Sequence, residues 1–141
     1  MSEEKTYTLS CFCGDVQMKV KGEPVMSGYC HCDSCREWSA APMSTFAFWK
    51  PENVEITKGE DKIISYIKSD KSYRKSCITC GGHLYTDFKP AGMYNIYPLI
   101  ISDFNFEPEM HVHYQESVIS IKDGLPKYKD VPRGSGELMP E

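Results

Sequence analysis

Residues 77–82 read CITCGG and residues 11–14 read CFCG, so two closely spaced cysteine pairs stand far apart along the chain. Both cysteines of such a pair can direct their sulfur atoms at one metal ion. Glycine follows each pair, and its backbone freedom lets N–H groups turn toward the sulfur atoms and offset their negative charge. One zinc ion shared by the pairs would tie the N-terminal strand to the middle of the chain and contribute to folding. The expected ligands of this structural zinc are Cys11, Cys13, Cys77 and Cys80.

Residues 30–35 read CHCDSC, which gives the chain a cysteine triplet as well as the two pairs. Three thiolates leave a zinc ion one open position, which is typical of catalytic sites. Because three anionic sulfurs weaken the Lewis acidity of zinc, the open position suits a thiol or thiolate better than an activated water. One hypothesis is therefore a catalytic zinc that holds a sulfur-containing substrate, and the other is a second structural zinc closed by an unidentified side chain. The expected ligands are Cys30, Cys32 and Cys35, whereas His31 is expected to point away from the metal.

Two other uses of the cysteines fit the sequence less well. A secreted disulfide framework is disfavoured by the odd count of seven cysteines and by the Cys-x-Cys spacing. Residues 1–5 are polar and acidic with no apolar stretch behind them, and no segment approaches the roughly 18 apolar residues of a membrane span. We therefore expect a cytoplasmic protein, in which thiols stay reduced. An iron–sulfur cluster would need a fourth nearby cysteine, and taking one would break a pair elsewhere.

Length and composition fit one ordinary globular domain. The chain has 141 residues, of which 40% are hydrophobic and 26% are charged. Its formal net charge of -4 argues against nucleic-acid binding, which needs clustered Lys and Arg to contact phosphates. We therefore expect a single zinc-binding domain over residues 1–141, with a small molecule as its partner rather than a nucleic acid or a membrane. Residues 131–141 are rich in Pro and Gly and predict a loose C-terminal tail.

Hydrophobic residues alternate with polar ones along much of the chain. Val16, Met18 and Val20, for example, are separated by polar residues, as in a half-buried strand. Gly, Pro, Asn and Asp punctuate similar segments and predict an all-β or β-rich domain. The expected strands cover residues 16–20, 25–29, 44–49, 54–57, 63–67, 73–77, 84–88, 94–101, 111–114 and 118–121. One short helical turn is expected over Asp33–Ser39, with Asp33 as its N-cap.

Together, the three cysteine motifs resemble the glutathione-dependent formaldehyde-activating enzyme family. The resemblance extends to Tyr73-Arg74 and to the run DGLP at residues 123–126, and it covers about residues 7–130. It implies a β-tent fold built from small antiparallel sheets, with a structural zinc on the two pairs and a labile catalytic zinc on the triplet. The implied reaction joins formaldehyde to glutathione as S-hydroxymethylglutathione and is formally that of a carbon–sulfur lyase.

Several other side chains have both a functional and a structural interpretation. Arg36, next to the triplet, can hold a substrate carboxylate bidentately or simply neutralise the thiolate cluster. His111 and His113 alternate on an expected strand, so both face one side and can approach a metal or substrate, or pack as ordinary histidines. The aromatic residues of segment 46–49 can line a ligand pocket, although core packing is the simpler interpretation.

Two function classes remain for the whole chain. A zinc enzyme that acts on a thiol adduct would use the triplet, whereas a non-enzymatic zinc module would use the same scaffold only for structure or interaction. A third class, the zinc deaminases, combines a Cys-x-x-Cys motif with a catalytic Glu. Here Glu37 follows the triplet, but Ser76 stands where those enzymes have Pro, and the helices of their fold are missing. The sequence identifies no general acid or base, and zinc–thiolate chemistry can proceed without one.

Overall fold

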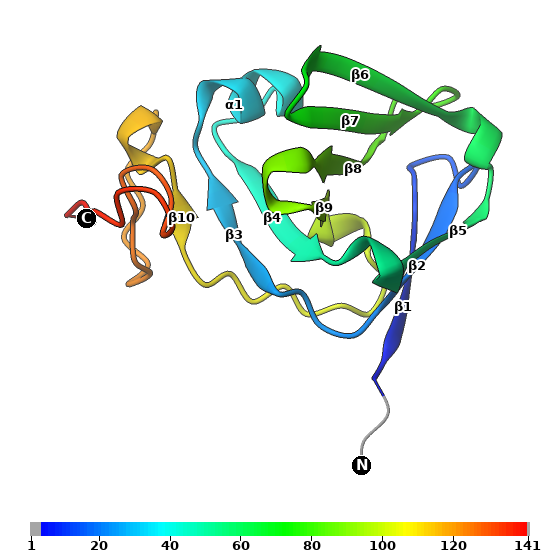
Figure 1. The fold of residues 1–141 in the computed structure, drawn as a ribbon, viewed down its shortest axis with the longest axis horizontal. Helices are drawn as coiled ribbons and strands as arrows, with labels where there is room; N and C mark the ends of the chain where they lie inside the picture. The colour runs from blue at the N-terminus through cyan, green and yellow to red at the C-terminus, as the bar shows by residue number, and fades with distance from the viewer. Residues whose placement is uncertain (1–3, 141) are drawn as a thin grey trace. The chain divides into compact units, whose positions relative to one another are not determined.

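The structure, a computed structural model, describes residues 4–140 and is rich in short strands (Figure 1). The β-rich fold class predicted from the sequence is confirmed. The strands are β1 (Thr6–Ser10), β2 (Gln17–Lys21), β3 (Met26–Cys30), β4 (Ser44–Trp49), β5 (Val54–Lys58), β6 (Ile63–Ser69), β7 (Ser72–Cys77), β8 (His83–Phe88), β9 (Met93–Ile96) and β10 (His111–Val112). The helix α1 covers Asp33–Ser39, and short 3-10 helices cover Pro51–Asn53, Glu60–Lys62, Lys89–Ala91, Pro98–Ile100 and Tyr114–Glu116.

Contacts between residues divide the chain into two compact units, each made of two chain segments. Unit 1 contains Met1–Met26 and Ala47–Phe106, and unit 2 contains Ser27–Phe46 and Glu107–Glu141. The paired cysteines therefore belong to unit 1 and the cysteine triplet to unit 2. Each unit builds its own metal-ligand candidates from its own segments.

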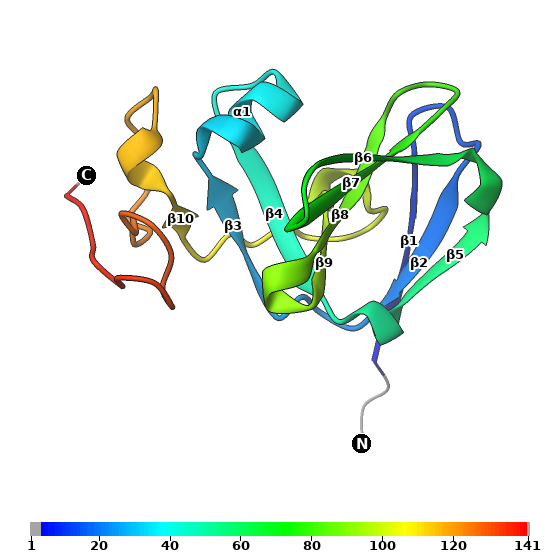
Figure 2. The ribbon, with the colours of Figure 1, turned by 45° about the horizontal axis from the view of Figure 1, so that its top comes forward.

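Unit 1 contains a three-stranded antiparallel sheet in the order β1-β2-β5 (Figure 2). Every second side chain of β1 and β2 is buried, with Leu9 opposite Met18 and Tyr7 opposite Val20. Their polar neighbours face solvent, as in a sheet that covers a core on one face. The strand β1 was not among the expected strands, although the same alternation runs through it.

A second run of antiparallel strands in unit 1 follows the order β4-β9-β8-β7-β6, to which β4 contributes its last residues. Trp49 at the end of β4 is almost fully buried, and its indole Nε1 donates to the carbonyl of Gly22 at 3.0 Å. Its ring also packs on Phe104, with ring centroids 5.7 Å apart. Burial of such a large ring with its N–H satisfied makes this aromatic segment part of the core, as the simpler interpretation predicted.

Unit 2 is built around β3, which pairs in parallel with β10. This parallel pair differs from the expectation of purely antiparallel sheets. Tyr29 N–H donates to the carbonyl of Met110 at 3.0 Å, and His31 N–H donates to that of Val112 at 3.1 Å. Gly28 makes this close approach possible, because a Cβ at this position would lie 2.3 Å from the Met110 oxygen. The end of β3, where the triplet begins, is thus fixed by the backbone of a distant segment.

The segment that was expected to be a loose tail folds back onto the preceding residues of unit 2. Lys129 N–H donates to the carbonyl of Glu137 at 2.7 Å, and Met139 N–H donates to that of Lys127 at 2.8 Å. The carboxylate of Asp130 holds the turn between them by accepting from the Ser135 hydroxyl at 2.7 Å. The described C-terminal residues are therefore hydrogen-bonded to the rest of unit 2.

Two elements have the bounds that the sequence predicts, and two predicted strands are wrong in extent or existence. The strand β4 and the helix α1 match their predicted ranges. The strand expected over residues 94–101 ends at Ile96, because Pro98 begins a 3-10 helix and has no N–H to offer a sheet. Residues 118–121 form no strand, and Val118 is 58% exposed despite its apolar side chain.

We expect Gly28→Ala to destabilise the fold by about 1–3 kcal/mol, because the added methyl group overpacks β3 against the Met110 backbone. Urea denaturation followed by circular dichroism measures this change. Ser120→Ala, at an exposed position, is the control and should stay within about 0.5 kcal/mol of the parent. Equal stability of Gly28→Ala and the parent would contradict the close approach of these two segments.

Candidate metal centres

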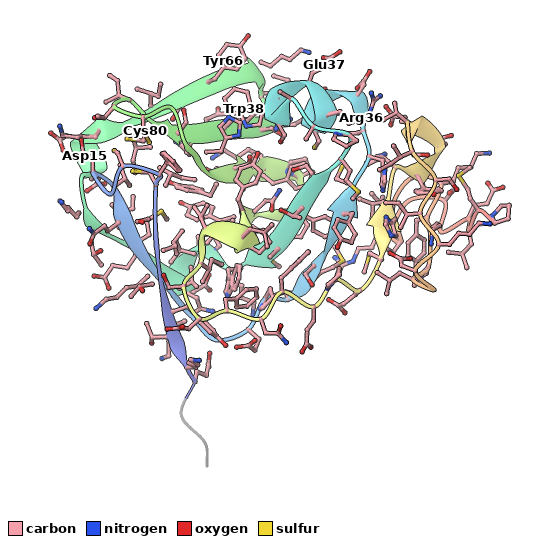
Figure 3. The ribbon with its side chains drawn as sticks, turned by 180° about the vertical axis from the view of Figure 1, so that it is seen from behind. Asp15, Arg36, Glu37, Trp38, Tyr66 and Cys80 are labelled. Carbon is pink, nitrogen blue, oxygen red and sulfur yellow. The ribbon has the colours of Figure 1, made fainter. Side chains whose placement is uncertain are left out.

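The paired cysteines of unit 1 come together at the ends of two strands. Cys11 directly follows β1 and Cys77 is the last residue of β7, while Cys13 and Cys80 lie in the turns that follow (Figure 3 labels Cys80). Their four sulfur atoms all lie within 4.8 Å of one another. Cys13 Sγ is 3.7 Å from Cys11 Sγ and 3.9 Å from Cys77 Sγ.

These separations fit a tetrahedral zinc ion. A tetrahedron with Zn–S bonds of about 2.3 Å has sulfur–sulfur edges of about 3.8 Å. A disulfide would instead need about 2.05 Å between its sulfur atoms, and all seven cysteines are free. The donor set is entirely sulfur, which suits zinc. The grouping of the two pairs predicted from the sequence is therefore present in unit 1.

Backbone N–H groups in the two turns point at the sulfur atoms, as the glycines after each pair suggested. Val16 N–H donates to Cys11 Sγ at 3.3 Å, and Gly82 N–H donates to Cys80 Sγ at 3.3 Å. The N–H of Gly82, with that of Cys13, lowers the pKa of the Cys80 thiol to about 6. Gly81 has a φ of 74°, which is the left-handed conformation that lets the chain turn here. These N–H groups therefore stabilise negatively charged sulfur at Cys11 and Cys80.

The cysteine triplet of unit 2 spans the junction of β3 and α1. Cys30 ends β3, Cys32 is the N-cap of α1 and Cys35 lies within its first turn, and their sulfur atoms lie within 4.8 Å of one another. The expectation that Asp33 caps the helix is wrong, because Cys32 Sγ accepts from Cys35 N–H at 3.3 Å in that role. The helix cap and the metal-ligand candidate are thus the same sulfur atom.

Two of the three sulfur atoms disfavour the ionised form of the third. Hydrogen bonds with the thiols of Cys32 and Cys35, together with burial, hold the pKa of Cys30 well above its ordinary value. A cation that binds all three sulfurs must therefore displace protons, and in return it removes the repulsion between thiolates. Three soft donors and no further His, Cys, Asp or Glu in the group, among the residues described, fit a soft cation with one position left open.

Arg36 lies beside the triplet on α1, as the sequence indicated (Figure 3). Its Nε donates to the carbonyl oxygen of His31 at 3.0 Å. This hydrogen bond ties the guanidinium to the loop between two candidate ligands, so Arg36 both contributes positive charge there and helps to hold the loop. Its other N–H groups can donate hydrogen bonds to a carboxylate.

Sequence reasoning missed a chain of hydrogen-bonded polar side chains that starts at His31, in which three residues are buried and Asp123 is partly exposed. His31 Nε2 lies 2.8 Å from His111 Nδ1, and His111 Nε2 lies 2.7 Å from Asp123 Oδ2. Lys127 Nζ lies 2.9 Å from Asp123 Oδ1. Both histidine residues are 0% exposed and Lys127 is 1% exposed. Four polar residues from three segments of the sequence are therefore linked in one series, which begins at His31 between two cysteines of the triplet.

Burial and charge fix the ionisation of this chain. Burial disfavours an ionised Asp123, but hydrogen bonds from His111 and Lys127 outweigh it and lower the pKa of the carboxyl well below its usual range. Burial, together with the electrostatic influence of the neighbouring side chains of His111, Arg36 and Lys127, lowers the pKa of His31 to about 4. Asp123 is thus a carboxylate and His31 a neutral imidazole near neutral pH.

The two histidines expected to share one face of a strand have different surroundings. The strand β10 ends at Val112, and His113 adopts a φ of 52° as the first turn of the next 3-10 helix begins. His111 is buried in the polar chain, whereas His113 Nδ1 lies 3.7 Å from Glu116 Oε2 in a partly exposed pair. The expectation of a common face is wrong, because the left-handed residue interrupts the period of two.

The cysteine motifs have known counterparts. A sequence profile described as glutathione-dependent formaldehyde-activating enzyme matches residues 6–116. That range contains all seven cysteines and His111, although it ends before Asp123. Within residues 4–140, no helix combines the length and apolar character that crossing a membrane requires.

Two individual proteins are also similar. An uncharacterized lyase of Schizosaccharomyces pombe is 29% identical over 79 residues, which are 56% of this chain and 56% of that protein. The match thus spans little more than half of the relative's length. A crystal structure of a Rhodobacter sphaeroides protein superposes with a TM-score of 0.59 at 19% identity, covering 70% of this chain and 90% of that one. At this identity the likeness concerns the fold alone.

We expect Cys77→Ser to release one zinc ion per chain and to destabilise unit 1 by more than about 3 kcal/mol, because the strand ends lose their common ligand. Metal analysis and thermal unfolding of the purified variant test this expectation. Thr79→Ala, in the same turn, is the matched control and should keep both zinc and stability. Full stability of Cys77→Ser without bound metal would contradict a structural site.

We expect Asp123→Asn to lose about 2–3 kcal/mol of stability at pH 7, since the buried ammonium of Lys127 would lose its carboxylate partner. The folded-state pKa of Asp123 is lowered, so its contribution is present above about pH 4 and is lost as the pH falls through the folded value. The difference between parent and variant should therefore shrink below about pH 4. Denaturant titrations at several pH values measure it, with Asp61→Asn at an exposed position as the control. A difference that is independent of pH would contradict this account.

Proposed function

The chain belongs to the glutathione-dependent formaldehyde-activating enzyme family, and from this premise we propose that it is a zinc-dependent, carbon–sulfur lyase-like enzyme acting on a thiol adduct. The observation that carries the proposal is the pair of unequal sulfur groups. The four sulfurs of unit 1 complete a tetrahedral donor set, whereas the three of unit 2 leave a metal one position for a substrate.

Cys30, Cys32 and Cys35 would hold the labile zinc, and Cys11, Cys13, Cys77 and Cys80 the structural one, which gives two zinc ions per chain. When bound at the triplet, zinc supplies a soft Lewis-acid position at which a thiol is kept deprotonated. The Arg36 side chain would add positive charge beside the triplet and hold the loop at His31. The two units would work together as one zinc-binding domain.

Glutathione and formaldehyde are the proposed substrates. The sulfur of the thiol forms a bond to the carbonyl carbon, and the thiol proton ends on the carbonyl oxygen, so the product S-hydroxymethylglutathione contains all atoms of both reactants. Arg36 would hold a carboxylate of the thiol substrate, because its Nε bond to His31 fixes the guanidinium beside the triplet. The reduced cysteines that both sites need would place the protein in the cytoplasm.

Cys32→Ser provides a sharp test, because serine is a good N-cap and preserves the start of α1 while removing one soft ligand. We expect the variant to fold, to lose the labile zinc and to accelerate the reaction at least about 100-fold less than the parent, as for loss of a transition-state interaction of about 2.7 kcal/mol. Exchange between free and adduct formaldehyde, followed by NMR with glutathione present, measures the rate. Ser34→Ala is the matched control.

No acceleration by the zinc-loaded parent would refute the proposed reaction while leaving the metal sites intact. Mild chelation separates the enzyme from a purely structural zinc module. We expect one zinc to leave without unfolding and to return on addition of zinc, because the triplet lies in unit 2 and holds only three ligands. A single tightly held zinc, or two zinc ions whose removal each unfolds the protein, would favour the structural module.

A further inference from the structure

His31 lies between two candidate ligands, and both its backbone and its ring make specific contacts. Its N–H donates to the Val112 carbonyl at 3.1 Å, and its own carbonyl accepts from Arg36 Nε at 3.0 Å. The imidazole ring is completely buried and meets the Tyr114 ring edge-on, with centroids 4.8 Å apart. The contacts that fix the orientation of this ring therefore also help to fix the backbone between Cys30 and Cys32.

The number of protons on each group determines which atom donates in the His31–His111 and His111–Asp123 hydrogen bonds. The Asp123 carboxylate can only accept, so His111 Nε2 carries the proton between them. A neutral imidazole has a single N–H, which leaves His111 Nδ1 as an acceptor. The proton between the two rings then belongs to His31 Nε2, and His31 Nδ1 is a bare lone pair.

The surroundings of His31 Nδ1 agree with this direction. It is buried, and it has no hydrogen-bond partner among the residues that the structure describes. A doubly protonated His111 would donate to His31 Nε2 and force the proton of His31 onto Nδ1. That arrangement would bury an N–H donor without an acceptor, which is costlier than an unused lone pair.

We propose that Asp123 and His111 are positioning residues for the triplet metal site, because their directed hydrogen bonds hold His31 in one tautomer and one ring orientation. The inference rests on the proposed function in that the triplet must bind a metal. Lys127 belongs to the same arrangement, since its ammonium keeps Asp123 in place from the other side. Segments near residues 111 and 123 thereby preorganise sulfur atoms that lie some eighty positions earlier in the chain.

The tautomer is tested first, on the zinc-loaded full chain labelled with ¹⁵N at histidine. Two-bond ¹H–¹⁵N spectra show which ring nitrogen carries the proton, and the chain has four histidines to assign. We expect the His31 proton on Nε2 and none on Nδ1. A His31 proton on Nδ1 would overturn the proposed direction.

Two substitutions of His111 then separate polarity from packing. His111→Phe keeps a ring against Tyr29 but breaks both hydrogen bonds, so we expect about 10–100-fold weaker zinc binding at the triplet and a mixture of His31 tautomers. His111→Gln supplies an amide N–H toward Asp123 and an amide oxygen toward His31, so it should restore the tautomer and most of the affinity. His113→Gln, two residues away, should bind like the parent.

Competition with a chromophoric zinc chelator measures the affinity, and amide NMR signals of unit 2, where His111 lies, report whether each variant is folded. Parent-like affinity in a folded His111→Phe variant would overturn the proposal. If that variant does not fold, His111→Gln decides the matter: restored tautomer and affinity support the proposal, and weak binding overturns it. These readouts need no turnover, so inactivity with glutathione and formaldehyde would refute only the proposed reaction.

Discussion

The ends of two strands of unit 1 that are distant in sequence bring four sulfur atoms within 4.8 Å of one another, which is the constraint on which we propose the fold of this unit depends. Thiolates at such distances repel one another strongly unless N–H groups and a cation neutralise them. The turns after β1 and β7 supply the N–H groups from Val16 and Gly82. We propose that a metal ion shared by the two turns fixes the ends of these strands, which would allow the strands themselves to be short.

The sequence predicts the local parts of this fold well and the long-range parts poorly. The strand β4 is recognisable because aromatic residues recur in it and Pro51 follows closely. The range of α1 was predicted with Asp33 as its cap, and the range is right although Cys32 is the cap. Residues 118–121 alternate equally well but find no partner strand, and β1 alternates without having been recognised. The alternation of hydrophobic and polar residues shows that a segment favours a strand. It does not show which other segment of the chain will pair with that strand in a sheet.

The candidate site shows the same division. Spacing alone groups the seven cysteines correctly, because ligands in a tight turn are neighbours in sequence. The chain from His31 to Asp123 has no such signature, since its members approach only when β10 pairs with β3. The capping role of Cys32 was missed for a chemical reason: a sulfur ligand can also accept the helix N–H that an aspartate was expected to accept.

The parallel pairing of β3 with β10 has a consequence for biosynthesis. Unit 1 ends at Phe106, so all of its segments are synthesised before the C-terminal part of unit 2. Cys30, Cys32 and Cys35 would by then have been synthesised, but the backbone and side chains that order them would not. The four cysteines of unit 1 are therefore all synthesised before the residues that order the triplet. The candidate site on the triplet would thereby be ordered later than the candidate site on the paired cysteines.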